Sequence, residues 1–333
     1  MQKYYPIFIL LSLLVSCNPK RETKYYFKEH DTKGWFIPVR IGEETYNFVF
    51  DTGSSNSLIE SKLANKLKLK VIDSTLIFKG RDKKISYHNQ TEKLVFNIAD
   101  IPMSTSFYYT TDNRNVIGMD IIKRYHWMFD RSNKTFQIQE KPILIETRSS
   151  DMIYKKKYRF NDVEVQVPIV DLLINDTISI PLLFDSGYAY THIYNADTTD
   201  ITMPPTITLE YYDQIDDNGF IRYIYDMYGN DALTYWIPSN FTLWLDSIAI
   251  DNLPPSDFYM PVDVDSIYKK VNKGYIGLLT WHFARQFRTL YINPEKQELT
   301  FIVSPQDSNL ISHPTNEEGL YLKHLRKLRH MKK

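Results

Sequence analysis

Short runs of apolar residues separated by polar turns fill much of the chain and predict β-strands. Residues 36–41 and 46–50 are two such runs with a polar turn between them, and residues 163–173 and 178–184 repeat this layout. Val, Ile, Phe, Tyr and Thr dominate the runs, and these residues favour strands over helices. The pattern therefore predicts a mostly β protein built from two related halves.

Each predicted hairpin leads into an acidic motif that consists of an aspartate, a hydroxyl residue and a glycine. Its members are Asp51, Thr52, Gly53 and Ser54 in the first half, and Asp185, Ser186 and Gly187 in the second half. A strand that presents a carboxylate at its end must turn at once, and glycine adopts backbone angles that other residues avoid. Two copies of the motif after apolar strands indicate one paired site, whereas a single copy would indicate an ordinary turn.

The likeness of the two halves continues downstream of each motif. An apolar pair and a glycine stand at residues 116–118 and again at residues 275–277. A short helical segment follows in each half, and then a hairpin with a polar turn, at residues 128–138 and 290–302. This common order of segments predicts an internal duplication.

The paired segments resemble the aspartic proteases, pepsin-like in having both lobes on one chain. Because the lobes are short, they are closer to the retropepsin-like lipoproteins of bacteria. The resemblance covers roughly residues 35–303. It implies an all-β, bilobal acid-protease fold with two related β-barrel lobes, a cleft between them and few short helices. The expected lobes are residues 35–145 and 155–304.

The resemblance implies that Asp51 and Asp185 form a dyad that hydrolyses peptide bonds with an activated water. Two carboxylates about 3 Å apart cannot both ionise, so they share a proton and divide the roles of base and acid. In the family, Thr52 and Ser186 hold the two turns in register, and Ser54 bonds the outer oxygen of Asp51. The alternative is that Thr52 and Ser186 only cap their own turns. The substrate would be a peptide or protein, and neither a metal nor a cofactor is needed.

Tyr188 departs from the family pattern, because a small hydroxyl residue is expected at this place. The larger phenol leaves a second interpretation open, a catalytically inactive lipoprotein that binds peptides or other ligands on the same fold. A flap is expected within residues 77–93, with Tyr87 as its candidate aromatic residue. A plain surface hairpin is the alternative for this segment.

Residues 1–17 resemble the signal peptide of a bacterial lipoprotein. Lys3 precedes an apolar stretch that is short for a membrane span, and residues 14–17 resemble a lipobox that ends in Cys17, the one cysteine of the chain. We expect a lipid on Cys17, a tether at residues 18–34 and a place in the bacterial cell envelope, facing the periplasm or in the outer membrane. A non-lipidated signal peptide is the alternative. Residues 305–333 are expected to form a basic tail.

Charge and length limit the remaining possibilities. Forty basic residues balance forty acidic ones, so no net field attracts nucleic acid. A chain of 333 residues is long enough for two lobes that each bury a core. We expect a monomer in which the two lobes form an intramolecular pseudo-dimer.

Overall fold

The computed structural model describes most of the first half of the chain and a smaller part of the second. The described residues are 24–30, 34–79, 85–110, 114–160, 166–174, 178–187, 192–193, 275, 277–285 and 287–304, with short strands between residues 224 and 261. The predicted signal peptide with Cys17, Tyr188 and the predicted basic tail lie outside these residues. No helix within the described part is long and apolar enough to cross a bilayer.

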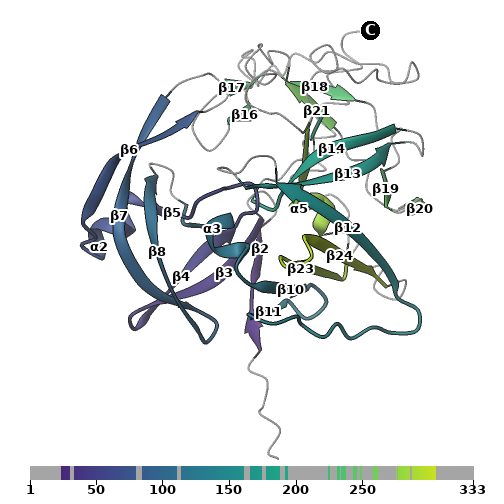
Figure 1. The fold of residues 1–333 in the computed structure, drawn as a ribbon, viewed down its shortest axis with the longest axis horizontal. Helices are drawn as coiled ribbons and strands as arrows, with labels where there is room; N and C mark the ends of the chain where they lie inside the picture. Colours follow the sequence, from purple (N-terminus) through teal and green to yellow (C-terminus); the bar gives the residue numbers. More distant parts are fainter. Residues whose placement is uncertain are drawn as a thin grey trace, which may run out of the picture.

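The first lobe is an eight-stranded sheet that closes on itself (Figure 1). Its strand order is β2-β3-β4-β9-β5-β8-β7-β6, and β3 also pairs with β7, where Val39 lies opposite Ile98. This additional pairing turns the sheet into a barrel, as the sequence predicted. The strands are β2 (Lys28–His30), β3 (Gly34–Ile41), β4 (Glu44–Phe50), β5 (Leu58–Glu60), β6 (Val71–Lys79), β7 (Ile85–Ile98), β8 (Ile101–Thr110) and β9 (Val116–Ile117).

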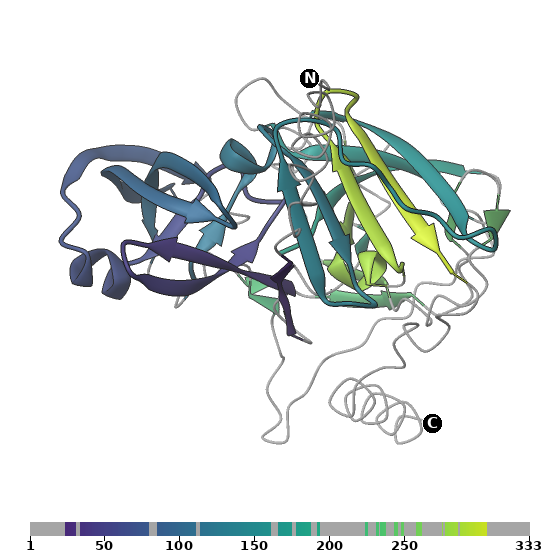
Figure 2. The ribbon, with the colours of Figure 1, turned by 90° about the horizontal axis from the view of Figure 1, so that it is seen from below.

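A 14-stranded sheet lies beside the first lobe (Figure 2). Its main path is β1-β11-β10-β23-β24-β12-β13-β14-β22-β15-β21-β18, and β19 and β20 branch from β13. The strands are β1 (Tyr25–Tyr26), β10 (His126–Asp130), β11 (Thr135–Gln139), β12 (Met152–Phe160), β13 (Pro168–Ile174), β14 (Ile178–Asp185), β15 (His192–Ile193), β18 (Thr234–Ile237), β19 (Leu243–Leu245), β20 (Ile248–Ala249), β21 (Phe258–Pro261), β22 (Gly277–Thr280), β23 (Thr289–Asn293) and β24 (Glu298–Val303). A separate pair consists of β16 (Ile224–Tyr225) and β17 (Asp231–Ala232).

The two halves of the chain meet in this large sheet. The closing hairpin of the first half, β10–β11, pairs antiparallel with the closing hairpin of the second half, β23–β24, and Trp127 lies opposite Ile292. Both predicted closing hairpins are therefore present. Together with the barrel they confirm the predicted all-β, bilobal architecture.

The N-terminal segment is more ordered than its polar composition suggested. Residues 18–34 were expected to be a tether, but β1 pairs with β11 and β2 pairs with β3. Phe27, between these two strands, is buried, and Glu29 forms an ion pair with the buried side chain of Arg131. The folded part therefore begins before the expected boundary at Trp35, because the apolar Phe27 and the paired Glu29 both contribute to the core region.

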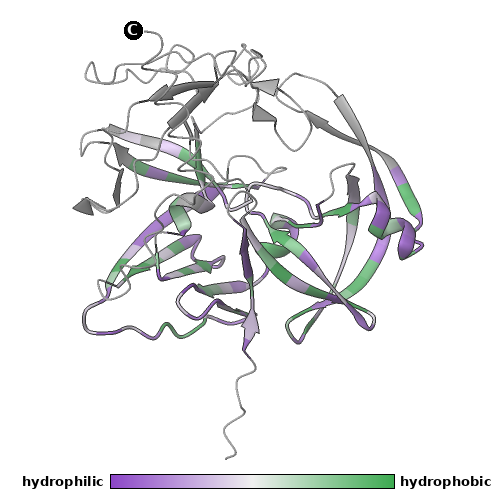
Figure 3. Cartoon of the chain, turned by 180° about the vertical axis from the view of Figure 1, so that it is seen from behind, coloured by the Kyte–Doolittle hydropathy of each residue, from purple (hydrophilic) through white to green (hydrophobic). Residues whose placement is uncertain are grey.

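Three short helices lie within the described part, and each follows a strand near one of the acidic motifs. They are α2 (Ser61–Lys66), α3 (Met119–Ile122) and α5 (Trp281–Ala284). Strands β3 and β11 show the two-residue alternation of a half-buried sheet, and Figure 3 shows apolar and polar segments alternating along the barrel. This alternation places the apolar face of each strand toward the core.

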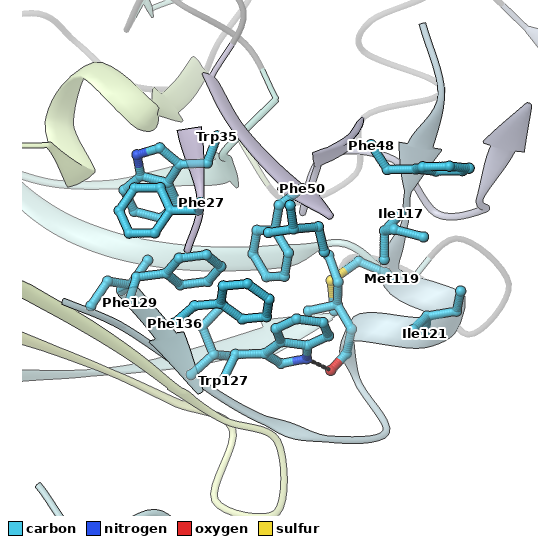
Figure 4. Packing of buried hydrophobic residues seen from close by; sticks show 14 of the residues in the cluster. Phe27, Trp35, Phe48, Phe50, Ile117, Met119, Ile121, Trp127, Phe129 and Phe136 are labelled. Carbon is cyan, nitrogen blue, oxygen red and sulfur yellow. Dashed lines mark hydrogen bonds between the residues drawn. The ribbon is translucent and has the colours of Figure 1, made fainter. Parts of the chain in front are cut away.

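An aromatic cluster supports the first acidic strand from below (Figure 4). The ring of Phe50, the residue before Asp51, lies 4.7 Å from that of Phe129 and 4.9 Å from that of Trp127, measured between centroids. Trp127 also donates a hydrogen bond of 3.0 Å from its indole Nε1 to the carbonyl oxygen of Ile122. Because these rings are fully buried, Phe50 has little freedom, and the start of the acidic turn is fixed by the core.

Candidate active site

Two parallel strand pairs deliver the two acidic side chains. Asp51 follows β4, which runs parallel to β9, and Asp185 ends β14, which runs parallel to β22. In both lobes the residue before the aspartate is a fully buried phenylalanine, Phe50 or Phe184. The same local architecture therefore presents both carboxylates.

The structure brings the two acidic turns into direct contact. The carboxyl groups of Asp51 and Asp185 are hydrogen-bonded to each other. Each carboxyl also packs on the glycine of the other turn. A Cβ added to Gly53 would lie 2.3 Å from Cγ of Asp185, and a Cβ added to Gly187 would lie 2.2 Å from Cγ of Asp51. These two glycines are required because the opposite carboxyl occupies the space of a side chain.

The expected reason for these glycines was wrong. The sequence suggested backbone angles that are closed to other residues, but among the described glycines only Gly34 and Gly42 have positive φ. Gly53 and Gly187 are therefore selected by close approach and not by backbone conformation. Gly34 makes a similar approach to the second turn, because its Cβ would lie 2.5 Å from the carbonyl oxygen of Ser186.

Four buried hydrogen bonds join the two turns through Thr52 and Ser186. The Thr52 hydroxyl donates to the carbonyl oxygen of Phe184 at 2.6 Å and accepts from the backbone N–H of Ser186 at 3.0 Å. The Ser186 hydroxyl donates to the carbonyl oxygen of Phe50 at 2.7 Å and accepts from the backbone N–H of Thr52 at 3.1 Å. The two hydroxyl groups thus bridge the lobes symmetrically, and the alternative that they only cap their own turns does not describe them.

Backbone amides orient each carboxylate. Asp51 Oδ1 accepts hydrogen bonds from the N–H groups of Gly53, at 2.8 Å, and Ser54, at 3.1 Å. Asp185 Oδ1 accepts one from the N–H of Gly187 at 3.0 Å. The Ser54 hydroxyl was expected to bond Asp51, but it donates instead to the carbonyl oxygen of Asn56 at 2.7 Å. Ser54 therefore orients the Asp51 carboxylate with its own backbone N–H and not with its hydroxyl group.

Burial raises the pKa of the Asp51 carboxyl above its ordinary value. The hydrogen bond with Asp185, the positive charge of Arg114 and the amides of Gly53 and Ser54 lower this pKa without reversing the shift. Asp51 is only 8% exposed, which explains why loss of hydration dominates. A pair of this kind holds a proton at a higher pH than an ordinary aspartate does, so both a proton donor and a proton acceptor are present in one site.

The second lobe differs from the first where the sequence suggested a match. Residues 275–277 were aligned with residues 116–118, but the strand register places Leu278 and Leu279 of β22 where Val116 and Ile117 lie in β9. Thr280 then takes the place of Gly118. Both residues stand directly before a short helix and have the same extended backbone, with φ of −103° at Thr280 and −98° at Gly118. The expected alignment was shifted by three residues because Gly277 was taken as the marker.

Three residues outside the acidic motif support the first acidic turn, and sequence reasoning missed two of them, Ser57 and Asp120. Gly118 permits the backbone of this turn to approach, since its Cβ would lie 2.4 Å from the carbonyl oxygen of Asn56. A hydrogen bond from Ser57 to Asp120 joins the turn to α3, and Asp120 accepts a second hydrogen bond from Thr105 of β8. No periodicity identifies such residues, because they are scattered in the sequence.

Two predicted site residues have no described side chain. The backbone of Tyr87 lies in β7 opposite Ile77 of β6, so the expected hairpin is present, but the side chain of Tyr87 lies outside the described part. Cys17 lies outside it entirely. Within the described residues no group of three or more His, Cys, Asp or Glu side chains is arranged to hold a metal ion.

A family model matches part of the chain, and solved structures are similar to it. The family model described as aspartyl protease matches residues 37–121, which include Asp51 and Gly118. Among solved structures, the crystal structure of an aspartic proteinase from Irpex lacteus is similar at 11% sequence identity and a TM-score of 0.49, covering 88% of this chain and 99% of that chain. No curated protein matched the sequence. Residues 37–121 of this chain are thus similar to the aspartyl proteases, and the paired acidic turns fit that similarity.

Proposed function

We propose that the chain is a membrane-anchored aspartic endopeptidase that uses Asp51 and Asp185 to activate a water molecule against a peptide bond. The observation that carries this proposal is the reciprocal seating of the two carboxyl groups, each on the glycine of the opposite turn. This seating needs both motifs and the contact of both lobes. A fold retained for packing alone has no need to bury two hydrogen-bonded acids against each other, because burial of such groups is costly.

The proposed reaction needs one shared proton. The ionised member of the pair takes a proton from the water, and the water oxygen attacks the carbonyl carbon of the substrate. The protonated member donates its proton to the carbonyl oxygen, which gives a neutral tetrahedral diol. The diol collapses when a proton passes to the amide nitrogen and the C–N bond breaks. The products are a carboxylic acid and an amine, and no residue of the chain forms a covalent bond.

The bridging hydroxyl groups of Thr52 and Ser186 serve this reaction by fixing the distance between the acids. Neither hydroxyl has a free hydrogen for a substrate, because each donates to a buried carbonyl oxygen of the other lobe. Their role is to hold the geometry. Misplacement of reacting groups by about 1 Å can lower a rate about a hundredfold.

The proposed location follows from the N-terminal sequence. A lipid on Cys17 would hold the chain at the bacterial cell envelope, facing the periplasm or in the outer membrane, with peptides or proteins as substrates. The test is to replace Cys17 by serine and to follow the chain by membrane fractionation. Transfer to the soluble fraction supports the anchor, and unchanged membrane association contradicts it.

The second candidate function is a peptide-binding lipoprotein without catalysis. It is favoured by two departures in the second lobe, Tyr188 in the sequence and Thr280 at the place of Gly118. A peptide that carries a hydroxyl group in place of the scissile carbonyl mimics the tetrahedral state and binds both kinds of protein. Only cleavage of an ordinary peptide separates them.

The decisive experiment is digestion of an unfolded protein by the purified chain from acidic to neutral pH. Wild type is compared with Asp51→Asn and Asp185→Asn, and with Asp100→Asn as a matched control, because Asp100 is an exposed aspartate in the turn between β7 and β8. Cleavage by wild type and the control alone supports the proposal. Cleavage that survives in either dyad variant contradicts the assignment, and tight binding without any cleavage favours the second candidate.

A further inference from the structure

A third aspartate lies behind the first acidic turn. The Ser57 hydroxyl donates to Asp120 Oδ1 at 2.7 Å, and the Thr105 hydroxyl donates to Asp120 Oδ2 at 3.2 Å. The backbone N–H of Ser57 also bonds the Asp120 carboxyl. The Ser57 hydroxyl in turn accepts a hydrogen bond of 3.0 Å from the N–H of Gly118. Both oxygens of Asp120 therefore accept hydrogen bonds, one from the turn segment before β5 and the other from β8.

The same residue also holds the turn through its backbone. The N–H of Asp120 donates to the carbonyl oxygen of Ser55 at 3.1 Å, and the N–H of Met119 donates to that of Ser54 at 2.8 Å. Ser54 is the residue whose own N–H bonds Asp51 Oδ1. A continuous set of hydrogen bonds thus runs from Asp120 through the turn to Asp51.

We propose that Asp120 is a positioning residue for Asp51, which acts by holding residues 54–57 against Gly118 when its carboxyl is ionised. We refer to Ser57, Thr105, Gly118 and Asp120 as the latch. The proposal rests on the proposed function, because positioning has meaning only if Asp51 takes part in a reaction. Asp120 contacts no substrate in this role.

The described part of the second lobe has different residues at two positions of the latch. Thr280 stands in the place of Gly118, and His282 stands in the α5 position that corresponds to Asp120 in α3. A Cβ at the position of Gly118 would lie 2.4 Å from the carbonyl oxygen of Asn56, so a threonine there would clash with the first turn. The latch therefore acts on Asp51, and residues Thr280 and His282 should not compensate for its loss.

The charges around Asp120 make the latch dependent on pH. Burial raises its pKa, against the hydrogen bonds from Ser57 and Thr105 and the positive charge of Arg124. From β8, Tyr108 faces it, and burial together with the charges of Asp73 and Asp120 raises the pKa of this phenol, so Tyr108 stays neutral in acid. When pH falls, Asp120 takes up a proton before an ordinary aspartate does. One of its oxygens then becomes a donor and can no longer accept from a hydroxyl.

The test compares Asp120→Asn and Asp120→Ala with wild type and the exposed control Asp100→Asn. Asparagine keeps the shape but loses one acceptor, so we expect kcat at neutral pH to fall about tenfold with KM nearly unchanged, and alanine to lower it further. Because protonation weakens the wild-type latch, the ratio of wild-type to Asp120→Asn kcat should shrink toward one in acid. An unchanged kcat, or a ratio that is the same at every pH, would overturn the proposal.

Hydrogen exchange gives a readout that does not require cleavage. Amides of residues 54–57 should exchange faster in Asp120→Asn than in wild type at neutral pH, and Asp100→Asn should match wild type. If wild type cleaves nothing, the proposed function fails, and exchange still decides whether Asp120 holds the turn. Unchanged exchange at residues 54–57 would refute the latch whether or not the chain is a peptidase.

Discussion

Replacing Gly53 by alanine tests the contact between the lobes most directly. The new Cβ would lie 2.3 Å from Cγ of Asp185 and 2.5 and 2.6 Å from its two oxygens. Carbon atoms that are not bonded rest about 3.5 to 4 Å apart, so the Asp185 carboxyl must move by about 1.2 Å or more. The backbone conformation is not the obstacle, since Gly53 is not among the glycines with positive φ.

This displacement should affect catalysis more than stability. A shift of about 1 Å in a reacting group can cost about a hundredfold in rate, so we expect kcat for peptide cleavage to fall by about that factor or more. Overpacking of a buried site costs about 1 to 3 kcal/mol of unfolding free energy. For a chain of this size that corresponds to about 2 °C in Tm for each kcal/mol. The assay is cleavage of a quenched fluorescent peptide, with thermal unfolding of the same samples.

Gly42→Ala is the matched control. Gly42 has a φ of +60°, and no atom lies within 4 Å of a Cβ added there. Alanine at this position suffers backbone strain of about 1 kcal/mol without any clash, so it should lower Tm slightly and leave kcat unchanged. If Gly53→Ala retains wild-type kcat, the two carboxyls are not seated as described. If both variants lose the same activity, general destabilisation and not the contact is responsible.

Three further outcomes follow from the buried polar groups. Ser186→Ala removes the donor to the Phe50 carbonyl and should lower the unfolding free energy in urea by about 1 to 3 kcal/mol or more; a change under about 0.5 kcal/mol would contradict the bridge. Asp51→Asn should raise the unfolding free energy at neutral pH but not below about pH 4. Burial raises the pKa of Asp51 in the folded state, so the folded protein loses stability as the pH rises through that pKa and the buried carboxyl ionises. Equal stability changes at both pH values would contradict this prediction. Asp151→Asn removes the charge beside buried Arg288, 2.5 Å away, and should cost about 3 to 5 kcal/mol by thermal or urea unfolding; a neutral effect would show that the pair is dispensable.

Much of the fold could be predicted from local pattern. The hairpin of β3 and β4 was evident from two apolar runs around a polar turn, and β23 and β24 followed from the same logic. The N-terminal strands were missed because the polar residues 18–24 suggested the start of a tether, which was expected to continue to residue 34. Glu29 is instead satisfied by Arg131 and by the indole N–H of Trp35 at 3.2 Å. A charge that is neutralised by a partner about a hundred residues away leaves no local signal.

The site was predictable where the sequence repeats and not where the lobes differ. Asp51 and Asp185, with the hydroxyl and glycine that follow each, lie together as the repeat indicated. The Ser54 hydroxyl turns to Asn56, because the turn is seated on Gly118 and brings the backbone N–H to Asp51 instead. Ser57 and Asp120 are 63 positions apart, and only the folded arrangement of β5, β8 and α3 joins them.

The two lobes therefore contribute unequally to one site. The bridge of Thr52 and Ser186 is symmetric, since each hydroxyl donates to a carbonyl and accepts an N–H from the opposite turn. The support behind the turns is not symmetric, because a Cβ at Gly118 would clash with the first turn, whereas the second lobe has the buried Thr280 at this place. Two acids in identical surroundings would share a proton equally. Different support behind Asp51 and Asp185 gives each acid its own environment, so the shared proton should favour one of the two carboxyl groups over the other.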